Sequence, residues 1–109
     1  GIDRTSIQMK DYDSHTKING DYSFGTKDGV HYLVELKTGE KVALEGVDKA
    51  FPLSVKNEDT NSTELALVVR KDQVWYMIDT KGETIYTFEQ TELTENSKLT
   101  LKDNKLQVE

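Results

Sequence analysis

The 109-residue chain has no cysteine, only one proline and no excess of basic residues. Without cysteine it has no disulfide framework, no thiolate metal site and no thiol nucleophile. Its 20 acidic residues outnumber its 14 lysines and arginines, which gives a formal net charge of −6. A protein that tracks a phosphate backbone needs a basic patch, so we expect no nucleic-acid partner and repulsion from anionic surfaces.

Long apolar runs are also missing. The longest are five residues, at 65–69 and 74–78, whereas a helix that crosses a bilayer takes about 20. We therefore expect no membrane insertion. No stretch of ten or more residues repeats its apolar side chains at the helical period, and residues 90–96 are expected to form one helical turn at most.

The chain lacks the common catalytic and metal-binding motifs. It has no Walker loop, no dinucleotide fingerprint and no G-x-S-x-G elbow. Residues 11–15 (DYDSH) begin like a calcium loop, but an EF-hand needs an acid, a glycine and a glutamate where the chain has His15, Thr16 and Tyr22. Residues 57–61 fail the same test at Ser62. We expect no enzymatic activity, no cofactor and no metal site.

What the sequence does contain is the two-residue alternation of β-strands. Residues 30–36 and 74–79 carry apolar side chains on both faces, which predicts central strands that are covered on both sides. A tight hairpin is expected at Lys71-Asp72 and an edge hairpin at Asp103-Asn104. We also expect a strand around Ile7 and Met9, a bend at Pro52, and an exposed loop over 56–63.

Two stretches of the chain resemble each other. Residues 28–45 read DGVHYLVELKTGEKVALE and residues 72–89 read DQVWYMIDTKGETIYTFE. Sequence repeats at a period of about 40 residues indicate repeated β-units, although two hairpins could share this composition by chance. We predict one all-β domain over 1–109, with two similar hairpin units at about 28–45 and 72–89. Its antiparallel hairpins, with about eight short strands, are expected to form a small barrel or sandwich.

Residues 47–86 resemble the bacterial WG-type (tryptophan–glycine) β-repeat family. The matching segments are VDKAF at 47–51, LALVV at 65–69, Trp75-Tyr76, and IDTKG at 78–82. Tyr76 and Tyr32 replace the glycine of the family pattern, and His31 replaces its tryptophan. Most members of this family resemble interaction or envelope-associated modules without an assigned activity. The resemblance therefore implies a bacterial protein that is extracytoplasmic or in the cell envelope.

These observations predict a non-catalytic interaction or binding module of a bacterial envelope or secreted protein, with a protein or a small molecule as its partner. The candidate binding residues are Trp75, His31 and Tyr32. Tyr76 shares its strand face with β-branched neighbours, so we expect Tyr76 to be buried and Trp75 to be partly exposed beside His31. The alternative is a small-ligand carrier with an internal barrel cavity. An open aromatic groove would favour the module, and a closed cavity would favour the carrier.

Overall fold

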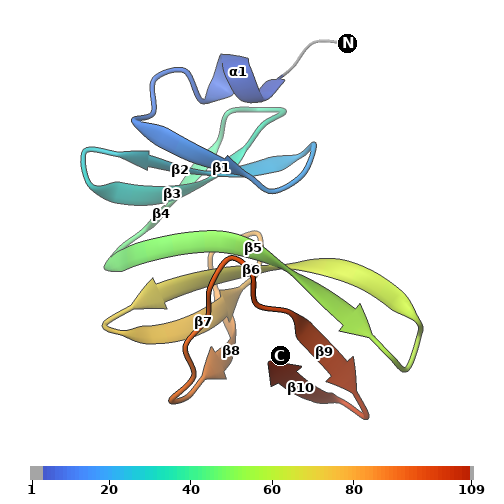
Figure 1. The fold of residues 1–109 in the computed structure, drawn as a ribbon. Coiled ribbons are helices and arrows are strands. Elements are labelled where there is room, and N and C mark those ends of the chain that lie inside the picture. The colour runs from blue at the N-terminus through green and yellow to red at the C-terminus, as the bar shows by residue number, and fades with distance from the viewer. Residues whose placement is uncertain (1–3, 109) are drawn as a thin grey trace.

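The computed structural model describes residues 4–108 and shows a mostly β protein (Figure 1). Its described part contains one short helix and ten strands, rather than the eight expected. The elements are α1 (Arg4–Gln8), β1 (Ser14–Lys17), β2 (Tyr22–Lys27), β3 (Val30–Glu35), β4 (Lys41–Leu44), β5 (Val47–Asn57), β6 (Ser62–Lys71), β7 (Val74–Ile78), β8 (Thr84–Phe88), β9 (Leu99–Lys102) and β10 (Lys105–Val108). Within residues 4–108 no helix has the length and apolar character needed to cross a membrane.

The strands form two sheets, as the all-β prediction requires. β1 to β4 make an antiparallel four-stranded sheet in chain order. The other sheet has the order β10-β9-β5-β6-β7-β8 and curls strongly into a half-barrel. All its neighbours are antiparallel except β5 and β9, which pair in parallel over a short stretch that begins at Val55 and Leu99. The predicted C-terminal hairpin therefore lies at one edge of the half-barrel.

Local turn chemistry explains the three tightest hairpins. Each is closed by two residues with positive φ, a conformation that glycine, asparagine and aspartate adopt most easily. The turns are Asp28-Gly29, Asp72-Gln73 and Asp103-Asn104. The Asp103-Asn104 prediction is confirmed, while the turn expected at Lys71-Asp72 lies one residue later.

The N-terminal segment covers the outer face of the four-stranded sheet. The strand expected around Ile7 and Met9 is wrong, because this segment forms α1 and then packs Met9 onto Val34 and Leu36. Gly25 makes the close approach possible, since a Cβ atom there would collide with the side chain of Met9. β3 is therefore covered on both faces, as its sequence predicts.

β5 is longer than the sequence suggested, and two expectations about it are wrong. Pro52 lies inside β5 opposite Leu67, not at a bend between two units. Proline is tolerated there because β9 joins β5 only from Val55 onward, so the strand has a neighbour on one side at Pro52. The exposed loop expected at 56–63 shrinks to 58–61, because Asn57 pairs with Ser62 and both belong to strands.

The half-barrel sheet has a core on each of its two faces. Its concave side is filled by a cluster of large apolar side chains, Phe51, Leu53, Ala66, Val68, Trp75, Phe88, Leu93 and Leu99. Its convex side packs against the four-stranded sheet through a second cluster, Ile18, Phe24, Leu33, Leu44, Leu67, Val69 and Ile78. This second cluster joins the two sheets.

The strand registers of the two three-strand meanders coincide except at the bulge after Met77, where Ile78 pairs with Thr84. In the first meander, His31 pairs with Thr26 on β2 and with Leu44 on β4. In the second, the residues 44 positions later pair in the same way, since Trp75 is opposite Arg70 and Phe88. The two repeated hairpin units remain a prediction, and this coincidence of register supports it.

Candidate functional site: an open cleft between the sheets

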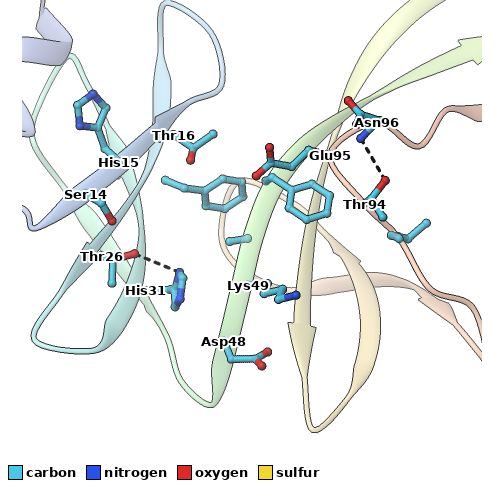
Figure 2. A pocket seen from close by; sticks show the side chains of 14 residues that line it. Ser14, His15, Thr16, Thr26, His31, Asp48, Lys49, Thr94, Glu95 and Asn96 are labelled. Atoms are coloured by element: carbon cyan, nitrogen blue, oxygen red, sulfur yellow. Dashed lines mark hydrogen bonds between the residues drawn. The ribbon is translucent and has the colours of Figure 1, made fainter.

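An open cleft of about 560 Å³ lies where the four-stranded sheet meets the start of β5 (Figure 2). Its volume is within the range of ligand clefts in proteins. The cleft has three walls, which come from β1–β3, from β5 and from the segment between β8 and β9. The lining residues are Ser14, His15, Thr16, Phe24, Thr26, His31, Asp48, Lys49, Ala50, Phe51, Leu93, Thr94, Glu95 and Asn96.

The β2–β3 hairpin supplies the first wall. Antiparallel pairing places Thr26 directly opposite His31, and both side chains point to the convex side of the half-barrel. The Thr26 hydroxyl lies 3.4 Å from His31 Nδ1, at the outer limit of a hydrogen bond. Both residues are half-buried, and both line the cleft.

The start of β5 supplies the second wall and a fixed charge. A register shift between Val47 and Lys49 leaves Asp48 outside the ladder. Its carboxylate accepts hydrogen bonds from Arg70 Nε, at 3.0 and 3.1 Å to its two oxygens, and forms an ion pair with Arg70 Nη2. The hydrogen bonds from Arg70 are the main reason why the pKa of Asp48 is lowered. Asp48 is therefore ionised at neutral pH and already partnered.

The third wall is the segment that crosses from β8 to β9. Leu93 anchors it, because its side chain is buried in the concave core of the half-barrel. Hydroxyl groups fix the turn that follows: Ser97 Oγ accepts a hydrogen bond from the Thr94 backbone N–H, and Thr94 Oγ1 accepts one from Asn96. Glu95 and Asn96 are left exposed at the rim.

The cleft thus combines a buried apolar floor with a polar rim. Phe24 and Phe51 form part of the floor, and both are almost completely covered by their neighbours. The rim offers hydroxyl, imidazole, amide and charged groups, which are able to orient a ligand through hydrogen bonds. Across residues 4–108, no three histidine, aspartate or glutamate side chains gather closely enough to hold a metal ion.

The acidic segments tested as calcium loops support turns in the described structure. Asp13 Oδ2 accepts a hydrogen bond from the Asp28 backbone N–H, which holds the β2–β3 turn. Asp59 Oδ2 does the same for Asp103 in the β9–β10 turn. Asn57 Oδ1 accepts from the backbone of Asp59 and of Thr60. These side chains have structural partners within the chain.

The three candidate binding residues do not come together. His31 lines the cleft, but Tyr32 lies on the opposite face of β3. There the ring of Tyr32 contacts Tyr12 edge-on, with 5.9 Å between ring centroids, and Lys41 Nζ lies 5.0 Å from its centre. Trp75 is in the other sheet.

The expectation that Trp75 is partly exposed beside His31 is wrong. Trp75 is 1% exposed and packs inside the half-barrel against Phe51, with 5.1 Å between ring centroids. Tyr76, expected to be buried, is only half-buried at the margin of the core that joins the sheets. Trp75 and Tyr76 do lie on opposite faces of β7, as the alternation predicts, but the face toward the concave side is the more deeply buried one.

The remaining cleft residues were missed by sequence reasoning. Thr26, Ala50 and residues 93–96 come from three segments that are far apart in the chain. Their only local signals were a strand-forming threonine and a polar segment after β8, and neither indicates which partner it will meet.

No protein-family model, curated protein or solved structure that was compared with this chain matches it.

Proposed function

We propose that the protein is a non-catalytic binding module and that the cleft between its sheets takes a small molecule or a segment of a partner protein. The observation that carries this proposal is the convergence of polar side chains from three separate segments on one open cleft with an apolar floor. Ligand sites in proteins have this composition.

The electrostatics of the cleft favour binding over catalysis. A catalytic histidine needs a nucleophile within hydrogen-bond reach and a group that orients its other nitrogen. Thr26 lies at the outer limit of that reach from His31. Asp48 is paired with Arg70, so its carboxylate is engaged away from the imidazole.

The packing of the half-barrel bears on the alternative, a carrier with an internal cavity. Its concave side holds Phe51, Trp75 and Phe88, and Leu93 reaches in from the connecting segment. Trp75 has 1% of its surface exposed. Since this interior is filled by the chain's own side chains, the open cleft is the better-supported binding site.

The setting of the protein belongs to the same proposal. The resemblance to the WG-type β-repeat supports a bacterial envelope or secreted protein, and the coincidence of register at a spacing of 44 residues supports a repeated β-unit. The acidic composition argues against nucleic acid as a partner.

The proposal is tested by NMR titration of isotope-labelled protein with a defined panel of monosaccharides, disaccharides, amino acids and tripeptides. We expect at least one class to shift the backbone resonances of Thr26, His31 and residues 93–96 in a saturable way. Thr26→Val removes the hydroxyl at the rim and keeps the β-branched shape. It should weaken binding about tenfold, the effect of one lost hydrogen bond.

The matched control is Thr87→Val, which makes the same change at an exposed position on β8, away from the cleft. This variant should bind like the original protein. The proposal is contradicted if no panel member shifts the cleft resonances, or if saturable shifts map only to other surfaces.

A further inference from the structure

A second hollow, separate from the cleft, lies at the open side of the half-barrel. β8 and β10 end the six-stranded sheet and do not pair with each other. Figure 1 shows them facing each other across the space beneath β5 and β6. We call this hollow, of about 530 Å³, the edge groove. It is lined mainly by apolar side chains, including Leu65, Met77, Ile85, Tyr86, Leu101 and Leu106.

The apolar side chains of the edge groove are unusually accessible. Ile85 is 59% exposed, Leu65 47% and Tyr86 41%. Together they account for three of the five large apolar residues that stand out as exposed in the described chain. Contiguous apolar surface of this kind marks interaction sites on soluble proteins.

β8 also presents a strand edge that no lysine guards, although this strand is short and has a bulge at Ile85. Natural edge strands are commonly guarded by lysine, and the other three edge strands each contain one, namely Lys17 in β1, Lys41 in β4 and Lys105 in β10. β8 reads TIYTF and contains no charged residue. Its β-branched and aromatic side chains have high β-propensity, so this edge is suited to accept another strand.

Charge around the groove indicates what kind of strand would fit. Among its lining residues, the side chains that carry a charge at neutral pH are two carboxylates, Glu64 and Asp79. Glu83 and Glu89 flank β8 at its two ends. Lys81 lies in the turn before β8 and Lys105 on the opposite edge, so the β8 side of the groove carries the excess of negative charge.

We propose that β8 binds an extended segment of a partner protein in which alternate residues are apolar and lysine or arginine stands at both ends. The segment adds to the free edge of β8 as a further strand, a mode in which main-chain hydrogen bonds provide affinity and side-chain pockets provide selectivity. Its apolar side chains enter the edge groove, and its basic ends face Glu83 and Glu89. A second copy of this chain is a poorer occupant, because each copy carries a net charge of −6.

This proposal is independent of the cleft. None of the residues that line the edge groove lines the cleft, so each site can fail without the other. Substitutions on β8 therefore test strand addition alone.

The test uses the full chain and a synthetic peptide, acetyl-Lys-Val-Thr-Val-Thr-Val-Lys-amide. Isothermal calorimetry should give a Kd of about 1 mM or tighter, and hydrogen exchange should show added protection of β8 amides. A peptide with proline at its central position cannot complete the ladder and should bind at least about tenfold more weakly.

Two lysine substitutions separate the groove from general surface effects. Ile85→Lys places a charge in the groove and should reduce binding at least about tenfold. Ile7→Lys is the matched control. Ile7 is 54% exposed, but it lies in α1, which is next to the four-stranded sheet and not next to the edge groove. Circular dichroism checks that both variants fold, and Ile7→Lys should bind like the original protein.

Three outcomes overturn the proposal. The first is no binding of the peptide at millimolar concentration, and the second is an equal loss of binding in Ile85→Lys and Ile7→Lys. The third is that the protein alone dimerises by sedimentation with its β8 amides protected, which would make a second copy the occupant. Strand addition is supported if Ile85→Lys weakens binding of the peptide, if the proline peptide binds weakly to the original protein, and if Ile7→Lys binds the peptide normally.

Discussion

At the scale of single residues, Trp75 and Tyr76 show what strand alternation determines and what it leaves open. Alternation places the two side chains on opposite faces of β7, as observed. Gln73 and Asp79 share the parity of Trp75 in the sequence, so the alternation indicates that the face of Trp75 is the more polar one. Gln73 lies in the turn before β7 and Asp79 lies after its end. Neither residue therefore indicates how exposed the Trp75 face of β7 is. Side chains from β5 and the side chain of Leu93 bury that face.

The burial of Trp75 predicts an order of stabilities. Trp75→Ala should lower the free energy of unfolding by about 3–5 kcal/mol, as truncation of core aromatics does. Tyr76→Ala should cost less, because Tyr76 is only half-buried. Urea denaturation of both variants measures the difference. If Trp75→Ala fails to fold, Trp75→Leu and Tyr76→Leu provide the matched comparison, and a larger cost at position 76 than at position 75 would contradict the assignment of faces.

At the scale of elements, local chemistry predicted the hairpins but not the segments that depend on distant contacts. The Asp103-Asn104 turn and the β6–β7–β8 meander follow from turn residues and alternation within a few positions. The helix α1 has no such signal, because the segment that follows it is placed by the close approach of Met9 and Tyr12 to Gly25 on β2. Pro52 reads as a bend in the sequence, and only the late start of the β9 pairing makes it acceptable inside β5.

The packing of the N-terminal segment predicts a loss of stability at high pH. Burial raises the pKa of Tyr12 above its ordinary value of 10.0, and the neighbouring Tyr32 raises it further. The folded state therefore keeps its proton at a pH where the unfolded state loses it. The stabilisation is complete below pH 10 and declines as the pH rises past that value.

Urea denaturation at pH 8, 10 and 11 tests this dependence. The free energy of unfolding should fall between pH 10 and 11, and the fall should be shallower in Tyr12→Phe, which cannot ionise at that position. Tyr86→Phe is the control, because this tyrosine is exposed on β8. An equal slope in Tyr12→Phe and in the original protein would show that Tyr12 does not couple folding to pH.

At the scale of the whole molecule, the central claim is that the two sheets form one body that holds the cleft between them. Leu33 and Phe24 of the four-stranded sheet share a buried cluster with Val69 and Ile78 of the half-barrel. The sequence predicted a barrel or sandwich of antiparallel hairpins, and the mostly β two-sheet structure agrees with it. It did not predict the cleft, because this site depends on how β2, β5 and residues 93–96 meet after folding.

Native-state hydrogen exchange tests this claim most directly. The most protected amides of β3 and of β6 should exchange with the same free energy of opening, because both are exposed only when the shared core unfolds. Ile78→Val, made in the half-barrel, should lower that free energy by about 0.5–1.5 kcal/mol for the amides of both strands alike. If the β3 amides exchange through a separate, lower-energy opening that Ile78→Val leaves unchanged, the two sheets are independent units and the cleft between them is not a fixed site.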